Sequence, residues 1–174
     1  MDNAVLQSLR TRRSVRAFRA EQVGDEALAA VLKAGTYAAT GRNKQSPIIV
    51  VIQSKEARET LRRMNAAVMG TPDRDPFYGA PTILVVLADA DVHTYLEDGS
   101  LVLGNLMNAA HAVGLASCWI HRAREEFASE EGKALLAKWG IQGNYVGVGH
   151  LALGYAEAPL PAASPRKEDY IYYV

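Results

Sequence analysis

The sequence predicts a single globular domain in which helices cover both faces of a β-sheet. Its 174 residues suffice for one sizeable hydrophobic core, and 49% of them are hydrophobic while 22% are charged. Two continuous apolar runs, 47–53 and 81–88, are rich in β-branched residues and typical of strands buried on both faces. Segments with helical periodicity separate such runs, so helices are expected on both sides of the sheet.

The first 46 residues are predicted to form two helices and a polar loop. Asp2 is expected to cap a short helix whose valine and leucines share one face and which ends before a cluster of arginines. A second amphipathic helix is predicted over 25–39. Residues 40–46 are too rich in turn-forming residues for either element, so they form a loop.

The next part of the chain is predicted to alternate strand and helix. The strand at 47–53 is followed by a helix at 55–67, for which Ser54 supplies the N-cap. A loop over 70–80 leads into the second buried strand, 81–88.

A long helix predicted over 94–113 is apolar nearly all round. Only Asn105, Asn108 and His111 form a polar stripe, because steps of three residues keep side chains close together on one helix face. One sheet in a domain of this size cannot cover so much apolar surface. A second subunit is therefore expected to supply the rest.

The last third of the chain is predicted to hold two strands, one helix and a tail. The strands are expected at 115–121 and 144–155, and Ser129 caps a helix over 130–139 between them. The tail, 156–174, is rich in proline and ends in Tyr-Ile-Tyr-Tyr-Val. Such an apolar, aromatic end is expected to pack on a partner subunit.

Composition argues against several classes of partner and compartment. The 19 basic and 19 acidic side chains cancel, so no overall field favours nucleic acid or an anionic membrane. No run of 18 apolar residues free of charge occurs, which disfavours a membrane span. The single cysteine, Cys118, excludes an internal disulfide and suits a reducing compartment, the cytoplasm.

Basic residues are concentrated near the N-terminus. The segment lacks the serine richness of a transit peptide and the apolar centre of a secretory signal, so it is expected to belong to the mature fold. Arg12, Arg13 and Arg16, with Ser14 between them, supply forked donors suited to a phosphate dianion. A solvated basic face is the alternative. The pair 166–167, Arg and Lys, could close the same anion site from the tail.

Two other patterns are weaker. Residues 147–152 match the letters of the dinucleotide motif G-x-G-x-x-A, but they lie within a predicted strand rather than between a strand and a helix. Their glycines are therefore interpreted as close-packing positions. The four histidines have no metal-binding spacing, so no metal site is predicted, and His111 and His150 are interpreted as partly buried, hydrogen-bonded side chains.

Taken together, five short motifs resemble those of the nitroreductase family of FMN-dependent oxidoreductases. In chain order they are Arg12-Arg13-Ser14-x-Arg16-x-Phe18, Asn43-Lys44-Gln45-Ser46-Pro47, Gly79-Ala80-Pro81, Ala109 to Leu115, and Leu153-Gly154-Tyr155 before a proline-arginine tail. The resemblance covers the whole chain. It implies one α+β sandwich domain over 1–174, with a central, mainly antiparallel sheet between helices. It further implies an intertwined homodimer with two FMN sites at its interface.

The same resemblance implies which residues contact the flavin. The phosphate and ribityl ligands correspond to Arg12, Arg13 and Arg166, with Ser14 beside them. The family often has a basic residue two positions before Arg166, where this chain has Ser164, and Lys167 could replace it. Arg16 corresponds to a basic residue at the pyrimidine edge of the ring, where positive charge favours the reduced flavin.

Two further segments complete the implied site. Asn43 and Gln45 match loop residues that reach the flavin from the partner subunit, although the letters around them depart from the family pattern. Thr40, with its neighbours at 39 and 41, is implied to lie along the ring. The strand residues Cys118, Trp119, Ile120 and His121 match the backbone beside the hydride-accepting edge.

The activity implied is reduction of nitroaromatics, quinones or similar acceptors by NAD(P)H in a ping-pong reaction. The flavin carries that chemistry, so no catalytic side chain is named. Alternatives within the family are a reductive dehalogenase, an enone reductase or an enzyme that consumes flavin. A flavin-binding module without turnover is an alternative from another class. A nucleic-acid binder is disfavoured because the basic segment lacks interleaved aromatic residues.

Overall fold

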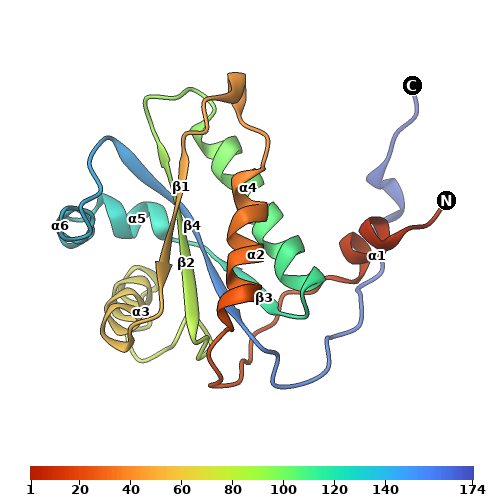
Figure 1. Cartoon of the computed structure of the whole chain (residues 1–174), viewed down its shortest axis with the longest axis horizontal. Coiled ribbons are helices and arrows are strands. Elements are labelled where there is room, and N and C mark those ends of the chain that lie inside the picture. Colours follow the sequence, from red (N-terminus) through yellow and green to blue (C-terminus); the bar gives the residue numbers. More distant parts are fainter.

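The computed structural model describes residues 1–174 and is built on one four-stranded sheet (Figure 1). Its strands are β1 (Pro47–Ile52), β2 (Thr82–Asp89), β3 (Ala116–Ile120) and β4 (Tyr145–Gly154). They lie in the order β1-β2-β4-β3, and every neighbouring pair is antiparallel. The α+β sandwich with a mainly antiparallel sheet, which the sequence resemblance implied, is therefore confirmed.

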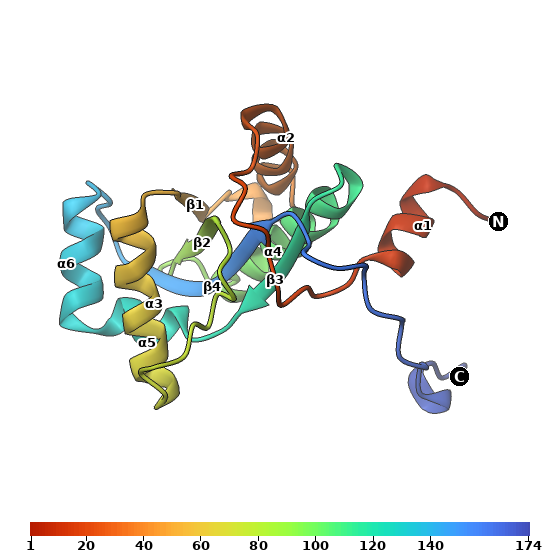
Figure 2. The same cartoon turned by 90° about the horizontal axis from the view of Figure 1, so that it is seen from below.

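Helices form one layer on each face of the sheet (Figure 2). One face is covered by α2 (Asp25–Thr36) and α4 (Tyr95–Ala112), and the other by α3 (Lys55–Met69), α5 (Ala123–Ala128) and α6 (Glu130–Lys138). Along β2, Val85 and Leu87 belong to the core cluster on the α3 side, whereas Leu84 and Val86 belong to the cluster on the α2 side. Burial on both faces explains why this strand is continuously apolar.

Three side-chain caps begin helices. Ser54 accepts a hydrogen bond from the N–H of Ala57, and Ser129 accepts one from Gly132, as predicted. The cap of α1 (Ala4–Thr11) is Asn3, which accepts from the N–H of Leu6. The expectation that Asp2 caps this helix is wrong, because the helix begins one residue later than that assignment needs.

Several element boundaries differ from the prediction. Helix α2 ends at Thr36 rather than Ala39, and the loop after it contains a single 3₁₀ turn, η1 (Gly41–Asn43). Helix α5 was not predicted, because six residues are too short to display a helical period. A second 3₁₀ turn, η2 (Glu168–Tyr170), lies in the tail.

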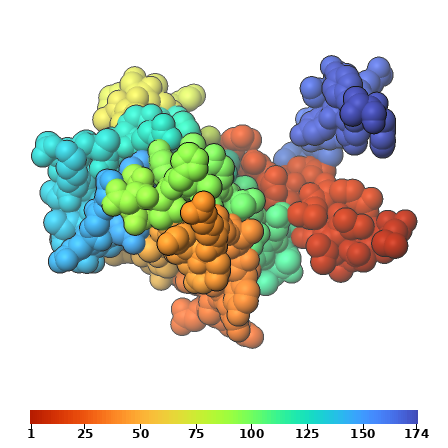
Figure 3. Space-filling model, turned by 90° about the horizontal axis from the view of Figure 1, so that it is seen from above, coloured from red at the N-terminus to blue at the C-terminus, as the bar shows by residue number.

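Helix α1 and the tail project from the same side of the body (Figure 3). Helix α1 has no buried residue, and its Val5 and Leu9 side chains are 68% and 50% exposed. The tail is exposed from Glu157 to Val174. Helix α1 contacts α4 through Thr11 and His111, but most of the apolar surface of α1 and of the tail stays exposed within one chain.

The glycines of the G-x-G-x-x-A sequence lie inside β4 and allow close packing, as interpreted from the sequence. A Cβ on Gly147 would lie 2.2 Å from the carbonyl oxygen of Ala123, and one on Gly149 would lie 2.5 Å from Nε1 of Trp119. Both contacts are too short for any side chain. No helix of the chain has both the length and the apolar character needed to cross a membrane.

Candidate functional site

The arginine-rich segment after α1 runs alongside the free edge of β3. The N–H of Val15 donates to the carbonyl of Ser117 at 3.0 Å, and Ser14 forms a parallel bridge with Ser117. Further along, the N–H of Arg19 donates to the carbonyl of Tyr155 at 2.9 Å. The segment is thus held between β3 and the start of the tail, so its arginines lie next to β3.

The tail brings a second basic segment to the same place. A cavity of 760 Å³ is lined by residues of α1, the arginine segment and the tail. Its polar lining consists of Arg10, Arg12, Arg13, Ser14, Arg16, Ser164 and Arg166. The structure therefore brings together five of the predicted site residues in one basic cavity.

Two buried guanidinium donors in this cavity lack protein partners. Arg13 is held through Nη1, which donates to the carbonyls of Arg10 and Arg12 at 2.7 Å each. Nη1 of Arg12 and Nε of Arg13 are nonetheless buried without a hydrogen-bond partner. Arg12, Arg13 and Arg16 form no ion pair with a carboxylate, whereas Arg10 pairs with Asp2. Unpaired guanidinium donors of this kind fit a phosphate group.

Cys118 lies where the arginine segment meets β3. Its side chain is 4% exposed and belongs to the core cluster on the α3 side. Burial raises the pKa of the Cys118 thiol, and the charges of Arg16 and Arg12 and a hydrogen bond with Ser14 oppose that shift. These influences show that the cysteine and the basic cavity are neighbours.

The other predicted strand residues lie in different environments. Ile120 packs in the same core cluster as Cys118, while Trp119 packs on the opposite face, with the cluster under α4. His121 follows the end of β3 and is exposed. Lys167 does not line the basic cavity; its Nζ lies 3.8 Å from a carboxylate oxygen of Asp169.

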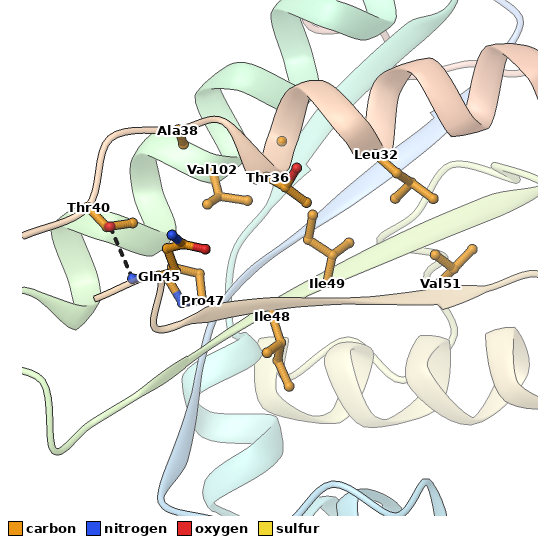
Figure 4. Close-up of a pocket in the computed structure, with 11 residues that line it drawn as sticks. Leu32, Thr36, Ala38, Thr40, Gln45, Pro47, Ile48, Ile49, Val51 and Val102 are labelled. Atoms are coloured by element: carbon orange, nitrogen blue, oxygen red, sulfur yellow. Dashed lines mark hydrogen bonds between the residues drawn. The ribbon is translucent and has the colours of Figure 1, made fainter. Parts of the chain in front are cut away.

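The predicted loop residues lie at the other end of α4. Thr40 and Gln45 line an apolar cavity of 360 Å³ between α2 and β1 (Figure 4). The hydroxyl oxygen of Thr40 accepts from the N–H of Gln45 at 3.1 Å, and the side chain of Asn43 accepts from that of Gln45. Arg42, Asn43 and Gln45 all have positive φ, between 50° and 52°, which is unusual for residues other than glycine.

The predicted site is therefore divided into two halves within one chain. The loop contacts the first turn of α4 through Asp98, whereas Thr11, next to the arginines, contacts His111 near the last turn. At 1.5 Å per residue, the 13 helical steps from Asp98 to His111 span about 20 Å. One chain does not bring the basic cavity and the loop together.

His111 is partly buried and hydrogen-bonded, as interpreted from the sequence, but its partner and other site features were not predicted. His111 Nε2 lies 2.8 Å from Oγ1 of Thr11 and ties α1 to α4, and burial and the charges of Arg12 and Arg13 lower its pKa. Asp98 is buried beneath the loop. Its position could have been found, because a four-residue spacing places it on the same helix face as the apolar Val102 and Leu106.

Comparisons with known proteins agree with this arrangement. The model of the family described as "Nitroreductase family" matches residues 9–155. A relative in Archaeoglobus fulgidus, provisionally named NADH dehydrogenase/NAD(P)H nitroreductase, is 30% identical over 86% of this chain and 84% of its own.

Solved structures are similar over their full length. A nitroreductase with bound FMN from Bacteroides fragilis has a TM-score of 0.90 at 28% identity, covering 99% of this chain and 100% of that one. A second, with bound FMN, from Desulfitobacterium hafniense, has a TM-score of 0.88 at 27% identity and covers 100% of both chains. The fold, the basic cavity and these matches lead to one conclusion: the chain belongs to the nitroreductase family.

Proposed function

We propose that this chain is an FMN-dependent oxidoreductase that uses NAD(P)H to reduce nitroaromatics, quinones or similar small acceptors. Bound FMN would supply the hydride-transfer chemistry, as it does in flavoenzymes generally. The observation that carries the proposal is the basic cavity, in which buried donors of Arg12 and Arg13 have no partner. Membership of the family and the FMN-bound structures that resemble the chain support the choice of ligand.

The cavity residues would bind and orient the cofactor. Arg12, Arg13 and Arg166 present guanidinium groups from two segments, and Ser14 adds a hydroxyl between them. Such forked donors match the oxygens of a terminal phosphate. Arg16 lines the same cavity near Cys118 and would place positive charge beside the flavin ring.

The complete site would require a homodimer. A two-fold axis across α4 would bring the arginine half of one chain to the loop half of its partner, because the two halves lie at opposite ends of that helix. Thr40, Asn43 and Gln45 would then reach the flavin bound by the arginines of the other chain.

Exposed apolar surface supports such an assembly. On α4, Leu101 is 50% exposed and Leu96 39% exposed, and the apolar residues of α1 are exposed as well. The tail, 156–174, would pack on the partner, where its aromatic end could be covered. Cys118 is free and buried, which suits the reducing cytoplasm that we propose as the compartment.

A spectrum of the purified protein tests the proposal. We expect a yellow protein with the absorption of non-covalent FMN, bleached by NADH or NADPH without oxygen and restored by a nitroaromatic or quinone. A colourless protein that also fails to bind added FMN would contradict the proposal. A protein that binds FMN but is not bleached by either nucleotide would be a flavin-binding module without turnover.

A further inference from the structure

The loop over 40–46 is held by one buried carboxylate. Oδ1 of Asp98 accepts from the N–H of Gly41 at 2.9 Å, near the start of the loop. Oδ2 lies 3.5 Å from the hydroxyl oxygen of Ser46 at the end of the loop, and it accepts from Oγ1 of Thr94 at 3.1 Å. Asp98 thus joins both ends of the loop to the first turn of α4.

The carboxylate is placed on a rigid support. Asp98 is 2% exposed and has no cationic partner, so hydrogen-bond donors and the positive end of the α4 dipole stabilise its charge. The next residue, Gly99, packs so tightly on β4 that a Cβ there would lie 2.5 Å from Val148. This turn of the helix therefore cannot shift easily toward or away from the sheet.

The loop needs such an anchor because its backbone is strained. Arg42, Asn43 and Gln45 all lie in the left-handed region of φ, and side chains in that region raise the energy of the backbone. A strained conformation persists only where the surroundings impose it. The loop also fits closely against α4, since a Cβ on Gly41 would lie 2.2 Å from Oγ1 of Thr94.

We propose that Asp98 is a positioning residue that holds the loop in its strained conformation, so that Thr40, Asn43 and Gln45 are preorganised for the flavin bound by the partner subunit. The inference rests on the proposed function, because it takes the loop to be one half of the flavin site. Asp98 itself does not touch the flavin. It acts through the N–H of Gly41 and the hydroxyl of Ser46.

Two substitutions with different chemistry test the anchor. Asp98→Ala removes the acceptor and leaves the N–H of Gly41 unpaired. Gly41→Ala keeps the carboxylate but forces the loop away from Thr94. Asp98→Asn is the rescue, since its amide oxygen can still accept from Gly41. Glu97→Ala is the matched control, because Glu97 lies in the same helical turn but is exposed.

The first measurement is hydrogen exchange in the flavin-free protein. For Asp98→Ala and Gly41→Ala we expect the amide exchange rates at 40–46 to rise by about tenfold or more, while the rates in β2 stay unchanged. A rise of this size is expected because each variant loses a buried hydrogen bond to a charged group. Unchanged β2 exchange shows that the variant is folded. Loop exchange within about twofold of the parent, or an equal rise in Glu97→Ala, would overturn the anchor.

The second measurement is flavin binding and the visible circular dichroism of the bound flavin. We expect the two loosening variants to bind FMN about tenfold more weakly and to change the dichroism, while Asp98→Asn stays near the parent. A mobile loop with unchanged affinity and spectrum would overturn the positioning role. If the parent protein binds no FMN, the proposed function fails, and the exchange data still decide whether Asp98 holds the loop.

Discussion

Arg12 and Arg16 belong to one short segment, yet their surroundings differ. Arg12 is half-buried and its Nη1 has no hydrogen-bond partner, as expected of a residue that binds an anionic ligand. Arg16 is exposed at the cavity, and its charge acts on the thiol of Cys118 in β3. The position of Arg12 therefore suits contact with the FMN phosphate, and the position of Arg16 suits contact with the flavin ring.

Substituting the two arginines should therefore have different effects. Arg12→Ala should weaken FMN binding by about 1.5–3 kcal/mol, the range for hydrogen bonds to charged groups. Arg16→Ala should lower the midpoint potential of the bound flavin, because it removes positive charge that favours the reduced form. Dissociation constants and potentials measured on both variants check this, with exposed Arg124→Ala as control. If Arg16→Ala shifts the potential by less than about 10 mV, roughly 0.5 kcal/mol for two electrons, Arg16 does not face the ring.

His111 makes stability depend on pH. The hydroxyl of Thr11 donates to the carbonyl of Gln7 at 2.8 Å, so its oxygen accepts from Nε2–H of His111. Burial and the neighbouring Arg12 and Arg13 lower the pKa of His111, whereas the unfolded chain keeps a value of about 6.5. The unfolded state thus binds more protons near that pH, and stability falls as the pH drops through about 6.5.

The expected outcome is a smaller pH dependence in His111→Gln than in the parent. Urea unfolding of the flavin-free protein, measured at several values between about pH 7.5 and 5.5, gives the free energy of unfolding for each. His93→Gln is the control, because His93 is exposed and far from the arginines in sequence. Parallel curves for the parent and His111→Gln would show that His111 does not contribute.

At the scale of elements, the core strands were predictable and the connections were less so. β2 is apolar at every core position because helices cover both its faces, and that pattern is visible in the sequence. Helix α5 has only six residues, fewer than two helical turns, so no period could identify it. Its place follows from tertiary contacts, which local sequence does not encode.

The same distinction applies to the candidate site. The arginine cluster was visible because unusual charge density marks it in the sequence. The role of Asp98 depends on where the loop folds back, 57 residues earlier in the chain. Only its occurrence on an apolar helix face hinted at a buried carboxylate.

Helix α5 is fixed to α3 and β4 by a buried polar cluster. Glu126 is 1% exposed; Oε1 accepts from the side-chain amide of Asn65, and Oε2 lies 3.3 Å from Nε2 of His150, which is fully buried. Asn65 in turn accepts from Nε of Arg122 at 2.9 Å. His150 was expected to be partly buried and hydrogen-bonded. It is instead fully buried beneath α5, and neither of its ring nitrogens has a hydrogen-bond partner.

Removing Glu126 should destabilise the fold strongly. Glu126→Ala removes one of the two acceptors of the Asn65 amide, which keeps its bond to the carbonyl of His121, and also removes the carboxylate oxygen beside Nε2 of His150. A buried donor left unpaired in this way should cost about 3 kcal/mol. Glu126→Gln keeps the shape and one acceptor, so about 1–2 kcal/mol is expected. Urea unfolding measures both, with exposed Glu125→Ala as control. A loss in Glu126→Ala no larger than in Glu125→Ala would show that the cluster adds no stability.

At the scale of the whole molecule, the single chain has an unpaired strand edge and exposed apolar surface. β1 has a partner on one side only, since β2 is its only neighbour in the sheet. The apolar cavity between α2 and β1 opens beside that edge. Helix α1 and the tail project from the body, and their apolar side chains are exposed. A chain with these features is expected to be stable as a dimer rather than as a monomer.

Removing the last five residues should weaken association. Tyr170, Ile171 and Tyr172 are 68%, 68% and 75% exposed, and such aromatic and aliphatic surface is normally covered by a partner. A chain ending at Asp169 keeps Arg166 in the basic cavity, so FMN phosphate contacts from the same chain are retained. Sedimentation velocity over a range of micromolar concentrations should show a dimer for the full chain and increasing monomer for the truncated one, with Glu168→Ala as a control in the same segment. A full chain that sediments as a folded monomer, or a truncated chain that dimerises equally well, would contradict the assignment of this tail to the dimer interface.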